Sequence, residues 1–204
     1  QDSYRKRNGI PINFPIDQKA FEKAIFTIVD GNEVTFVPKN AKTLRAIAFE
    51  PVMNLFLQLG AEGVIRRGLK RWGVDLDDQT RNQRYARIGS LDDTLSTIDL
   101  QSASDSVSQK IWELLLPPDW YSFLCKLRSE SGIVDGKDVT YEKISSMGNG
   151  YTFALEALIF SSVCYATFMQ HGLTWRSKKV AVYGDDIIVP AEISGSLVAN
   201  LELC

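Results

Sequence analysis

Two adjacent aspartates, Asp185 and Asp186, lie between two short apolar runs, Val180–Tyr183 and Ile187–Val189. The pattern predicts a β-hairpin whose tight turn begins at Gly184. Runs this apolar are usually buried, so the turn would raise the two carboxylates out of a core. Neighbouring carboxylates repel each other unless a cation lies between them, and Mg²⁺ prefers oxygen ligands of this kind. The stretch is a candidate metal site, and the alternative is a solvated acidic turn.

A third carboxylate, Asp99, lies at the end of a short apolar strand predicted over Leu95–Leu100 and precedes the small polar residues 101–106. A carboxylate at a strand end, followed by small residues, suits a ligand that must be approached closely. The alternative is that Asp99 caps the next helix. Asp105 suits that capping role better, because an apolar helical stripe begins at Val107.

Positive charge gathers in the first part of the chain, where Lys39, Lys42 and Arg45 recur at every third residue. Cations at this spacing can surround a polyphosphate, although an exposed basic loop is the alternative. Residues 1–87 hold 15 Lys and Arg against 10 Asp and Glu, whereas residues 88–204 hold 8 against 15. A basic half that collects phosphates and an acidic half that holds a metal suit nucleotide chemistry.

A loop of small residues leads into an apolar helix predicted over Thr152–Gln170, in which Glu156 is the only charged side chain. Such a helix is expected to be buried nearly all round. A lone carboxylate in its first turns is either a partner of the helix dipole or a ligand contact. Ser146, Asn149 and Thr152 could hydrogen-bond sugar hydroxyls at the start of this helix.

Composition narrows the class of protein. The 204 residues are 45% hydrophobic and 24% charged, which excludes disorder and leaves room for one large domain or two small ones. No apolar run approaches the roughly 20 residues that span a bilayer, so no membrane contact is expected. A single histidine offers little to a hydrolase triad, and three distant cysteines fit neither a disulfide framework nor a zinc knuckle.

The rest of the pattern predicts helices joined by short strands. Helices are expected over Gln18–Val29, Val52–Arg71 and Asp119–Arg128, with a strand over Glu33–Val37.

The order and spacing of these segments resemble motifs F, A, B and C of the viral RNA-dependent RNA polymerases. These motifs are the basic stretch, the Asp-x5-Asp segment after a strand, the small-residue loop before an apolar helix, and the Tyr-Gly-Asp-Asp hairpin. The chain is similar to the replicase subunit of the RNA bacteriophages, the Q-beta and MS2 group. The likeness covers nearly the whole chain, and the segments that carry it are Val37–Thr43, Asp75–Thr80, Leu114–Pro118, Thr140–Phe153 and Tyr183–Ile188.

The resemblance implies an α+β protein with the right-hand polymerase fold. Residues 1–90 would belong to the fingers, and residues 91–204 to a palm whose antiparallel sheet is backed by helices. The thumb and an amino-terminal portion would be missing, which implies a fragment that could be inactive alone.

The resemblance also implies template-directed RNA synthesis by a two-metal mechanism. Asp99, Asp185 and Asp186 would be the catalytic residues and would hold two Mg²⁺ ions, or Mn²⁺ in their place. The implied nucleotide-binding residues are Lys39, Lys42, Arg45, Asp105, Ser146, Gly148, Asn149, Thr152 and Glu156.

Motif B departs from the common family pattern. Where many of these polymerases have Ser-Gly followed by Thr and then Asn, this chain has Met147-Gly148, Thr152 and Glu156. The departure concerns the residues that would select ribose.

The implied partners are an RNA template and product, ribonucleoside triphosphates, host translation elongation factors and a ribosomal protein, in the cytoplasm of the infected bacterial host. Two alternative functions remain for the chain. A reverse transcriptase shares the Tyr-x-Asp-Asp pattern, although the glycine at position 184 argues against it. A catalytically silent RNA-binding module would bind RNA with a steep salt dependence and would not need Asp185.

Overall fold

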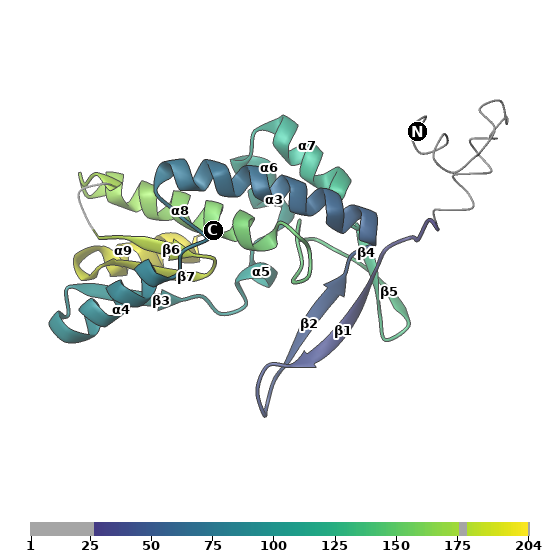
Figure 1. Cartoon of the computed structure of the whole chain (residues 1–204), viewed down its shortest axis with the longest axis horizontal. Helices are drawn as coiled ribbons and strands as arrows, with labels where there is room; N and C mark the ends of the chain where they lie inside the picture. The colour runs from purple at the N-terminus through teal and green to yellow at the C-terminus, as the bar shows by residue number, and fades with distance from the viewer. Residues whose placement is uncertain (1–26, 176–178, 204) are drawn as a thin grey trace, which may run out of the picture. The chain divides into compact units, whose positions relative to one another are not determined.

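The computed structural model of the chain describes residues 27–175 and 179–203 (Figure 1). By its contacts the chain divides into two compact units, residues 1–30 and 31–204, and the second unit is described below. Helices and sheets are mixed in this unit, which confirms the predicted α+β class. The helix expected over Gln18–Val29 lies outside the described residues except for its last three positions, which are not helical.

From residue 31 onward, the described chain alternates short strands with helices of very different length. In chain order the elements are β1 (Asn32–Pro38), β2 (Leu44–Phe49), α3 (Val52–Trp72), α4 (Thr80–Asp92), β3 (Leu95–Asp99), α5 (Ala103–Ser106), α6 (Gln109–Leu115), α7 (Pro118–Leu127), β4 (Ser131–Val134), β5 (Lys137–Thr140), α8 (Thr152–Gln170), β6 (Ala181–Tyr183), β7 (Asp186–Pro190) and α9 (Ala191–Glu202). Helices α3, α7 and α8 and the hairpin at the aspartates were predicted to within about one residue, whereas no helix was predicted over α4.

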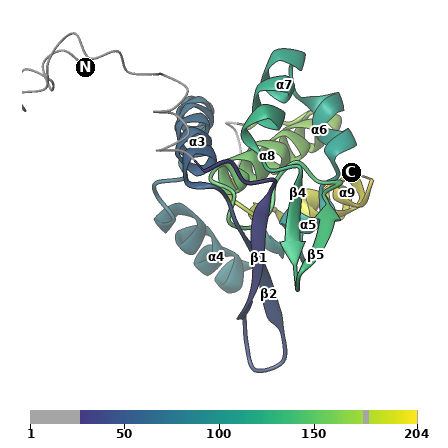
Figure 2. The same cartoon turned by 90° about the vertical axis from the view of Figure 1, so that its right-hand side faces the viewer.

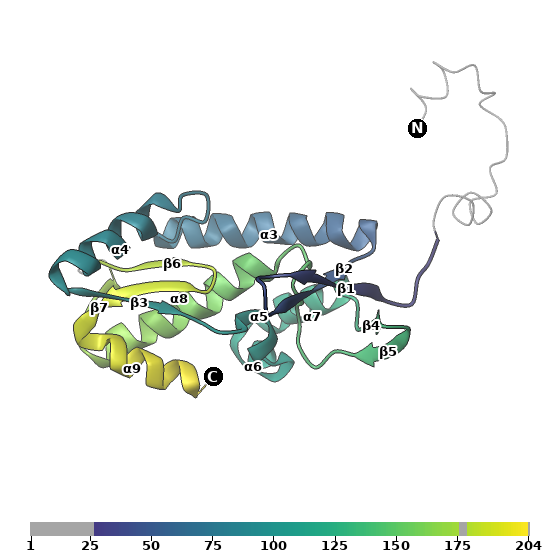
Figure 3. The ribbon, with the colours of Figure 1, turned by 90° about the horizontal axis from the view of Figure 1, so that it is seen from below.

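A three-stranded antiparallel sheet, in the order β3-β7-β6, carries the aspartates. Strands β6 and β7 are apolar on both faces because both faces of the sheet are covered (Figure 3). Leu95, Ala181 and Ile188 pack against α4, whereas Ile187 and Val189 join the main core with α8 and α9. The central strand β7 is therefore fixed from both sides, and only its end at Asp186 is exposed.

Helix α8 runs through the core, and its residues are buried on nearly every side, as its composition predicts. By length and composition alone it could cross a membrane, so the expectation that no apolar run approaches that length was wrong. In the folded chain 67% of its apolar stretch is buried, which is the behaviour of a core helix.

A second sheet, in the order β2-β1-β4-β5, has four strands (Figure 2). Strands β1 and β2 form an antiparallel hairpin, and β1 pairs in parallel with β4. Buried Glu50, after β2, joins the start of β1 to the segment between α7 and β4. It accepts hydrogen bonds from Asn32 Nδ2 (3.2 Å) and Ser129 Oγ (2.8 Å). These donors satisfy a carboxylate that would otherwise be costly to bury.

Asp105 does not cap the helix behind it, so that prediction was wrong. It lies inside the short helix α5, and the extended backbone of Val107 (φ −85°, ψ 107°) separates α5 from α6. The residue at the capping position of α6 is Ser108, whose side chain makes no capping hydrogen bond. Asp105 is thereby left free to interact outside its own helix.

Candidate functional site

The strand register brings Asp99 and Asp186 together, although 86 residues separate them in the chain. They are direct Cα partners in the antiparallel pairing of β3 with β7, and Asp186 is also the partner of Tyr183 in β6. Side chains of directly opposed residues lie on the same face of a sheet, within reach of each other. The two carboxylates are therefore neighbours at the exposed end of the sheet.

Asp185 adjoins this pair in the turn of the hairpin. The loop between β6 and β7 has only two residues, Gly184 and Asp185, and Gly184 has a left-handed φ of 62°. A positive φ at the first loop position is the arrangement that favours glycine in a type II′ hairpin. The short loop holds Asp185 directly beside Asp186.

The electrostatics of the site favour a cation. Partial burial raises the pKa of Asp186 above its ordinary value, and the negative charges of Asp185 and Asp99 raise it further. A divalent ion between the carboxylates would relieve this repulsion. Among residues 27–175 and 179–203, no three His, Cys, Asp or Glu side chains lie close enough to hold a metal ion by themselves.

Glu156 adds a fourth carboxyl group to the same electrostatic field. It lies in the second turn of α8 and is 9% exposed. Burial raises the pKa of Glu156 to about 7, and the charges of Asp185 and Asp105 contribute to the shift. The carboxyl groups of motifs A, B and C thus influence one another.

The raised pKa of Glu156 predicts a pH-dependent stability. In EDTA, which removes metal ions, Glu156 of the folded chain keeps its proton between about pH 4.5 and pH 7, whereas Glu156 of the unfolded chain has released it. The free energy of unfolding therefore falls as pH rises through this interval. We expect Glu156→Gln to be about 2 kcal/mol more stable than the wild type at pH 8 and equal to it below pH 4.5. Urea denaturation at both pH values measures this difference.

The exposed residue Glu142 provides the matched control, since Glu142→Gln removes the same charge at the surface. An equal gain at pH 8 from both variants would show that the effect is general charge repulsion rather than the burial of Glu156.

Lys143 forms an ion pair with Asp105, joining the loop before α8 to α5. The backbone oxygen of Lys143 also accepts a hydrogen bond from Nη1 of buried Arg128 at 3.0 Å. Arg128 in turn donates from Nη2 to Gln109 Oε1 at 3.0 Å. Asp105 is therefore engaged by a lysine whose backbone is fixed from α6 and α7.

The loop that precedes α8 is held by its own hydrogen bonds. Thr152 Oγ1 donates to the backbone oxygen of Ser146 at 2.7 Å, and Asn149 Oδ1 accepts from the backbone N–H of Tyr151 at 3.0 Å. All three predicted sugar-binding residues are buried, and the Nδ2 of Asn149 has no hydrogen-bond partner among residues 27–175 and 179–203. A buried donor without a partner is unusual and marks a group that a ligand can satisfy.

Gly148 connects this loop to the basic hairpin. Its φ is 105°, and a β-carbon at this position would collide with the backbone oxygen of Ala48 and lie 3.1 Å from Ile47 Cγ2 in β2. The backbone N–H of Ala48 donates to Met147 O at 2.8 Å. Only glycine allows β2 and the loop to approach this closely.

The predicted phosphate-binding cations lie on that hairpin. Lys39 and Lys42 are in the turn between β1 and β2, which closes through a bond from Lys39 N–H to Thr43 O at 2.9 Å, and Arg45 lies in β2 opposite Val37. All three cations are exposed, and no ion pair involves them within the part of the chain that the structure describes. Their charges remain available to an anionic ligand.

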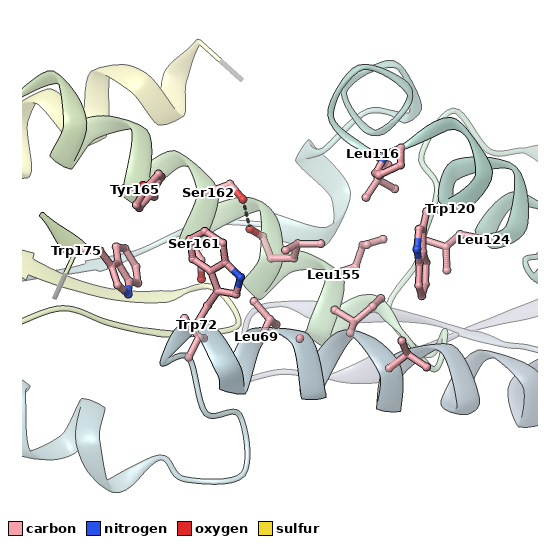
Figure 4. Close-up of a pocket in the computed structure, with 16 residues that line it drawn as sticks. Leu69, Trp72, Leu116, Trp120, Leu124, Leu155, Ser161, Ser162, Tyr165 and Trp175 are labelled. Atoms are coloured by element: carbon pink, nitrogen blue, oxygen red, sulfur yellow. Dashed lines mark hydrogen bonds between the residues drawn. The ribbon is translucent and has the colours of Figure 1, made fainter.

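A hollow of about 530 Å³ lies elsewhere, among α3, α7 and α8 (Figure 4). Its wall is mostly apolar and aromatic, including Trp72, Trp120, Tyr165 and Trp175, and none of the described residues that line it is charged. It has no group that would bind a triphosphate or a metal. A second hollow, of about 440 Å³, is lined by Asp99 together with residues of α6, α8 and α9.

The sequence did not predict two contacts of the site. Phe153 packs against the turn at Gly184, and Asn82 Nδ2 of α4 donates to the backbone oxygen of Asp186 at 3.4 Å. Neither residue carries a sequence signal of this role, because both contacts depend on the placement of distant helices.

Comparison with known proteins identifies the family. The family model described as "RNA replicase, beta-chain" matches residues 12–204. The chain belongs to the RNA replicase beta-chain family. The RNA-directed RNA polymerase subunit beta of Enterobacteria phage SP is 50% identical over 193 residues, which are 90% of this chain and 33% of that protein.

Other replicase subunits give the same result. The RNA-directed RNA polymerase subunit beta of Escherichia virus Qbeta is 54% identical over 84% of this chain and 29% of its own length. The RNA-directed RNA polymerase beta chain of Escherichia phage MS2 is 50% identical over 86% of this chain and 32% of its own length. The chain thus spans about a third of the length of the replicase subunits it matches.

Proposed function

We propose that this chain forms the catalytic centre of an RNA-directed RNA polymerase that replicates the positive-strand RNA genome of a phage. The observation that carries the proposal is the pairing of Asp99 with Asp186, beside Asp185, in a chain of the replicase family. Carboxylates from two motifs, Asp99 of motif A and Asp185 and Asp186 of motif C, lie at one exposed strand end, where a nucleotide can approach them.

The three aspartates fit Mg²⁺. This ion is usually held by one or two carboxylates together with substrate phosphates rather than by a closed protein cage. Two paired carboxylates and a third in the adjoining turn match that requirement. When bound, two such ions would neutralise the triphosphate and the leaving pyrophosphate and lower the pKa of the attacking 3′-hydroxyl.

The basic hairpin would hold the triphosphate. Lys39 and Lys42 offer mobile point charges, and Arg45 offers a bidentate fork to phosphate oxygens. Their exposure supports this role, as does the contact that joins β2 to the loop before α8 at Gly148. Phosphoryl transfer depends on positioning and charge neutralisation, so the chain needs to supply little covalent chemistry.

The loop before α8 would hold the sugar and base. The Nδ2 of Asn149 is the best supported donor, because it is buried and has no partner in the described part of the chain. Glu156 is linked electrostatically to Asp185 and to Asp105. In this proposal Asp105 and Glu156, with Ser146 and Thr152, select ribose, and Glu156 takes the place of the Asn in the more common Thr and Asn pair.

In the right-hand description, the three-stranded sheet with α8 and α9 corresponds to the palm, and the basic hairpin corresponds to the fingers. A division at residue 90 remains a prediction. The pairing of β1 with β4 shows that contacts cross that boundary. The thumb would come from the part of the replicase that this chain does not span.

The partners follow from the same proposal. The replicase would bind an RNA template and product and ribonucleoside triphosphates, work in the cytoplasm of the infected bacterium, and recruit translation elongation factors and a ribosomal protein of the host. The names of the related phage polymerases support the template and nucleotides.

Nucleotide incorporation on an RNA template, by a replicase that contains this chain, tests the proposal. We expect ribonucleotides to be incorporated and deoxynucleotides to be rejected. Preferred incorporation of deoxynucleotides would instead indicate a reverse transcriptase, and RNA binding without incorporation would indicate a silent binding module.

Lys42→Ala tests the proposed phosphate contact of the hairpin. We expect the apparent KM for nucleotides to rise about tenfold, the equivalent of one lost charge-assisted hydrogen bond, while template affinity changes less. Steady-state kinetics and filter binding measure the two quantities. Lys137→Ala, in the exposed strand β5, is the matched control. A larger effect on template binding than on KM would indicate that the hairpin contacts the RNA template rather than the triphosphate.

A further inference from the structure

The turn that carries Asp185 rests on an aromatic side chain from another element. Phe153, the second residue of α8, lies against the ring of Tyr183 with the ring centres 4.9 Å apart and the planes at 70°. This is the edge-to-face arrangement that aromatic pairs prefer. Tyr183 is the last residue of β6, so the contact is made at the first step of the turn.

The same ring also fills the space beside Gly184. A β-carbon at Gly184 would collide with Phe153 Cε2 and would lie 2.8 Å from Cδ2. The φ of 62° already disfavours any other residue there. Two independent features, the backbone conformation and the ring, therefore require glycine at this position.

Phe153 is itself held in place from α3. The guanidinium carbon of Arg66 lies 5.6 Å from the centre of the Phe153 ring, within the range of a cation–π contact. Arg66 is fixed by Glu62 and by Asp77, each at 3.0 Å. A series of contacts therefore connects Arg66 of α3 to Phe153 of α8 and Phe153 to the hairpin. It ends at Gly184, the residue before the two aspartates.

We infer that Phe153 is a positioning residue that holds the Tyr183-Gly184 turn so that Asp185 and Asp186 stay beside Asp99. The inference rests on the proposed function, because it gives the turn the task of presenting carboxylates. Phe153 touches none of the reacting groups in this account. It acts through the turn, and its loss would let the turn move away from the end of β3.

The stability of the chain tests the contact itself. In a double-mutant cycle of Phe153→Leu and Gly184→Ala, the thermal unfolding midpoint reports whether the ring and the new methyl group compete for one space. We expect the double variant to lose less than the sum of the two single losses, because the smaller side chain makes room for the methyl group. Additive losses would overturn the contact.

Metal dependence tests the positioning role in a replicase that contains this chain. We expect Phe153→Leu to raise the Mg²⁺ concentration for half-maximal incorporation about 3- to 10-fold with the nucleotide KM unchanged, and Phe153→Tyr, which keeps the ring, to behave as the wild type. Phe168→Leu, a fully buried change in the same helix, controls for destabilisation and should leave the Mg²⁺ requirement unchanged.

The outcomes separate the inference from the proposed function. Equal Mg²⁺ requirements for Phe153→Leu and Phe168→Leu would overturn the positioning role, even if the replicase is active. Full incorporation by Asp185→Asn would overturn the proposed function, and the unfolding cycle would still decide whether Phe153 supports the turn.

Discussion

Asp185→Asn and Asp99→Asn are each expected to reduce nucleotide incorporation by at least about 10³-fold in a replicase that contains this chain, because charge neutralisation is the main task of the site. Each substitution keeps the size of the side chain and removes one negative charge. Asp99 is exposed at the end of β3 and Asp185 lies in the two-residue loop between β6 and β7, so the fold should survive the changes. Primer extension measures incorporation, and circular dichroism checks the fold.

Asp93→Asn is the matched control for this experiment. Asp93 is exposed, lies six residues before Asp99 and has a left-handed φ of 54°, which asparagine tolerates well. The control should incorporate nucleotides at the wild-type rate. Normal incorporation by Asp99→Asn or Asp185→Asn would refute their assignment to the metal site.

The second large effect is expected at Gly148. Gly148→Ala would impose an unfavourable backbone conformation and drive a methyl group into the backbone oxygen of Ala48. We expect it to lower the free energy of unfolding by at least about 3 kcal/mol, since strain and collision add. It should also weaken nucleotide binding, because the bond from Ala48 N–H to Met147 O joins the basic hairpin to the loop. Urea denaturation measures the first effect.

Gly136→Ala separates conformation from collision. Gly136 has a similar left-handed φ of 75°, but a β-carbon there meets no atom within 4 Å. The expected loss is only about 1–2 kcal/mol, the cost of the backbone conformation alone. If both variants lost the same stability, the close approach of Gly148 to β2 would not matter.

Local patterns predicted most of the elements around the site. The apolar runs on either side of Gly184 and Asp185 predicted the hairpin, and the apolar sequence after Thr152 predicted α8, because these signals depend only on neighbours in the chain. The prediction that Asp99 lies near Asp186 came from the family resemblance. Spacing along the chain could not provide it, since β3 and β7 pair across 86 residues.

The contacts that predictions missed all join distant segments. The pairing of Asp105 with Lys143 depends on the break between α5 and α6 at Val107, which no turn residue signalled. The contact of Phe153 with Gly184 depends on how α8 crosses the hairpin. An aromatic residue in an apolar helix is usually part of a core, so the sequence offered no reason to separate Phe153 from its neighbours.

The central claim is that Asp99, Asp185 and Asp186 hold Mg²⁺. A change of metal preference is its most direct test. Asp185→Cys replaces an oxygen ligand by a thiolate, a softer ligand that binds Mg²⁺ poorly and accepts softer divalent ions. We predict that a replicase carrying Asp185→Cys loses nucleotide incorporation in Mg²⁺. We also predict that the ratio of incorporation in Mn²⁺ or Cd²⁺ to incorporation in Mg²⁺ is higher than in the wild type. Wild-type incorporation in Mg²⁺, with an unchanged ratio between the metals, would contradict the account.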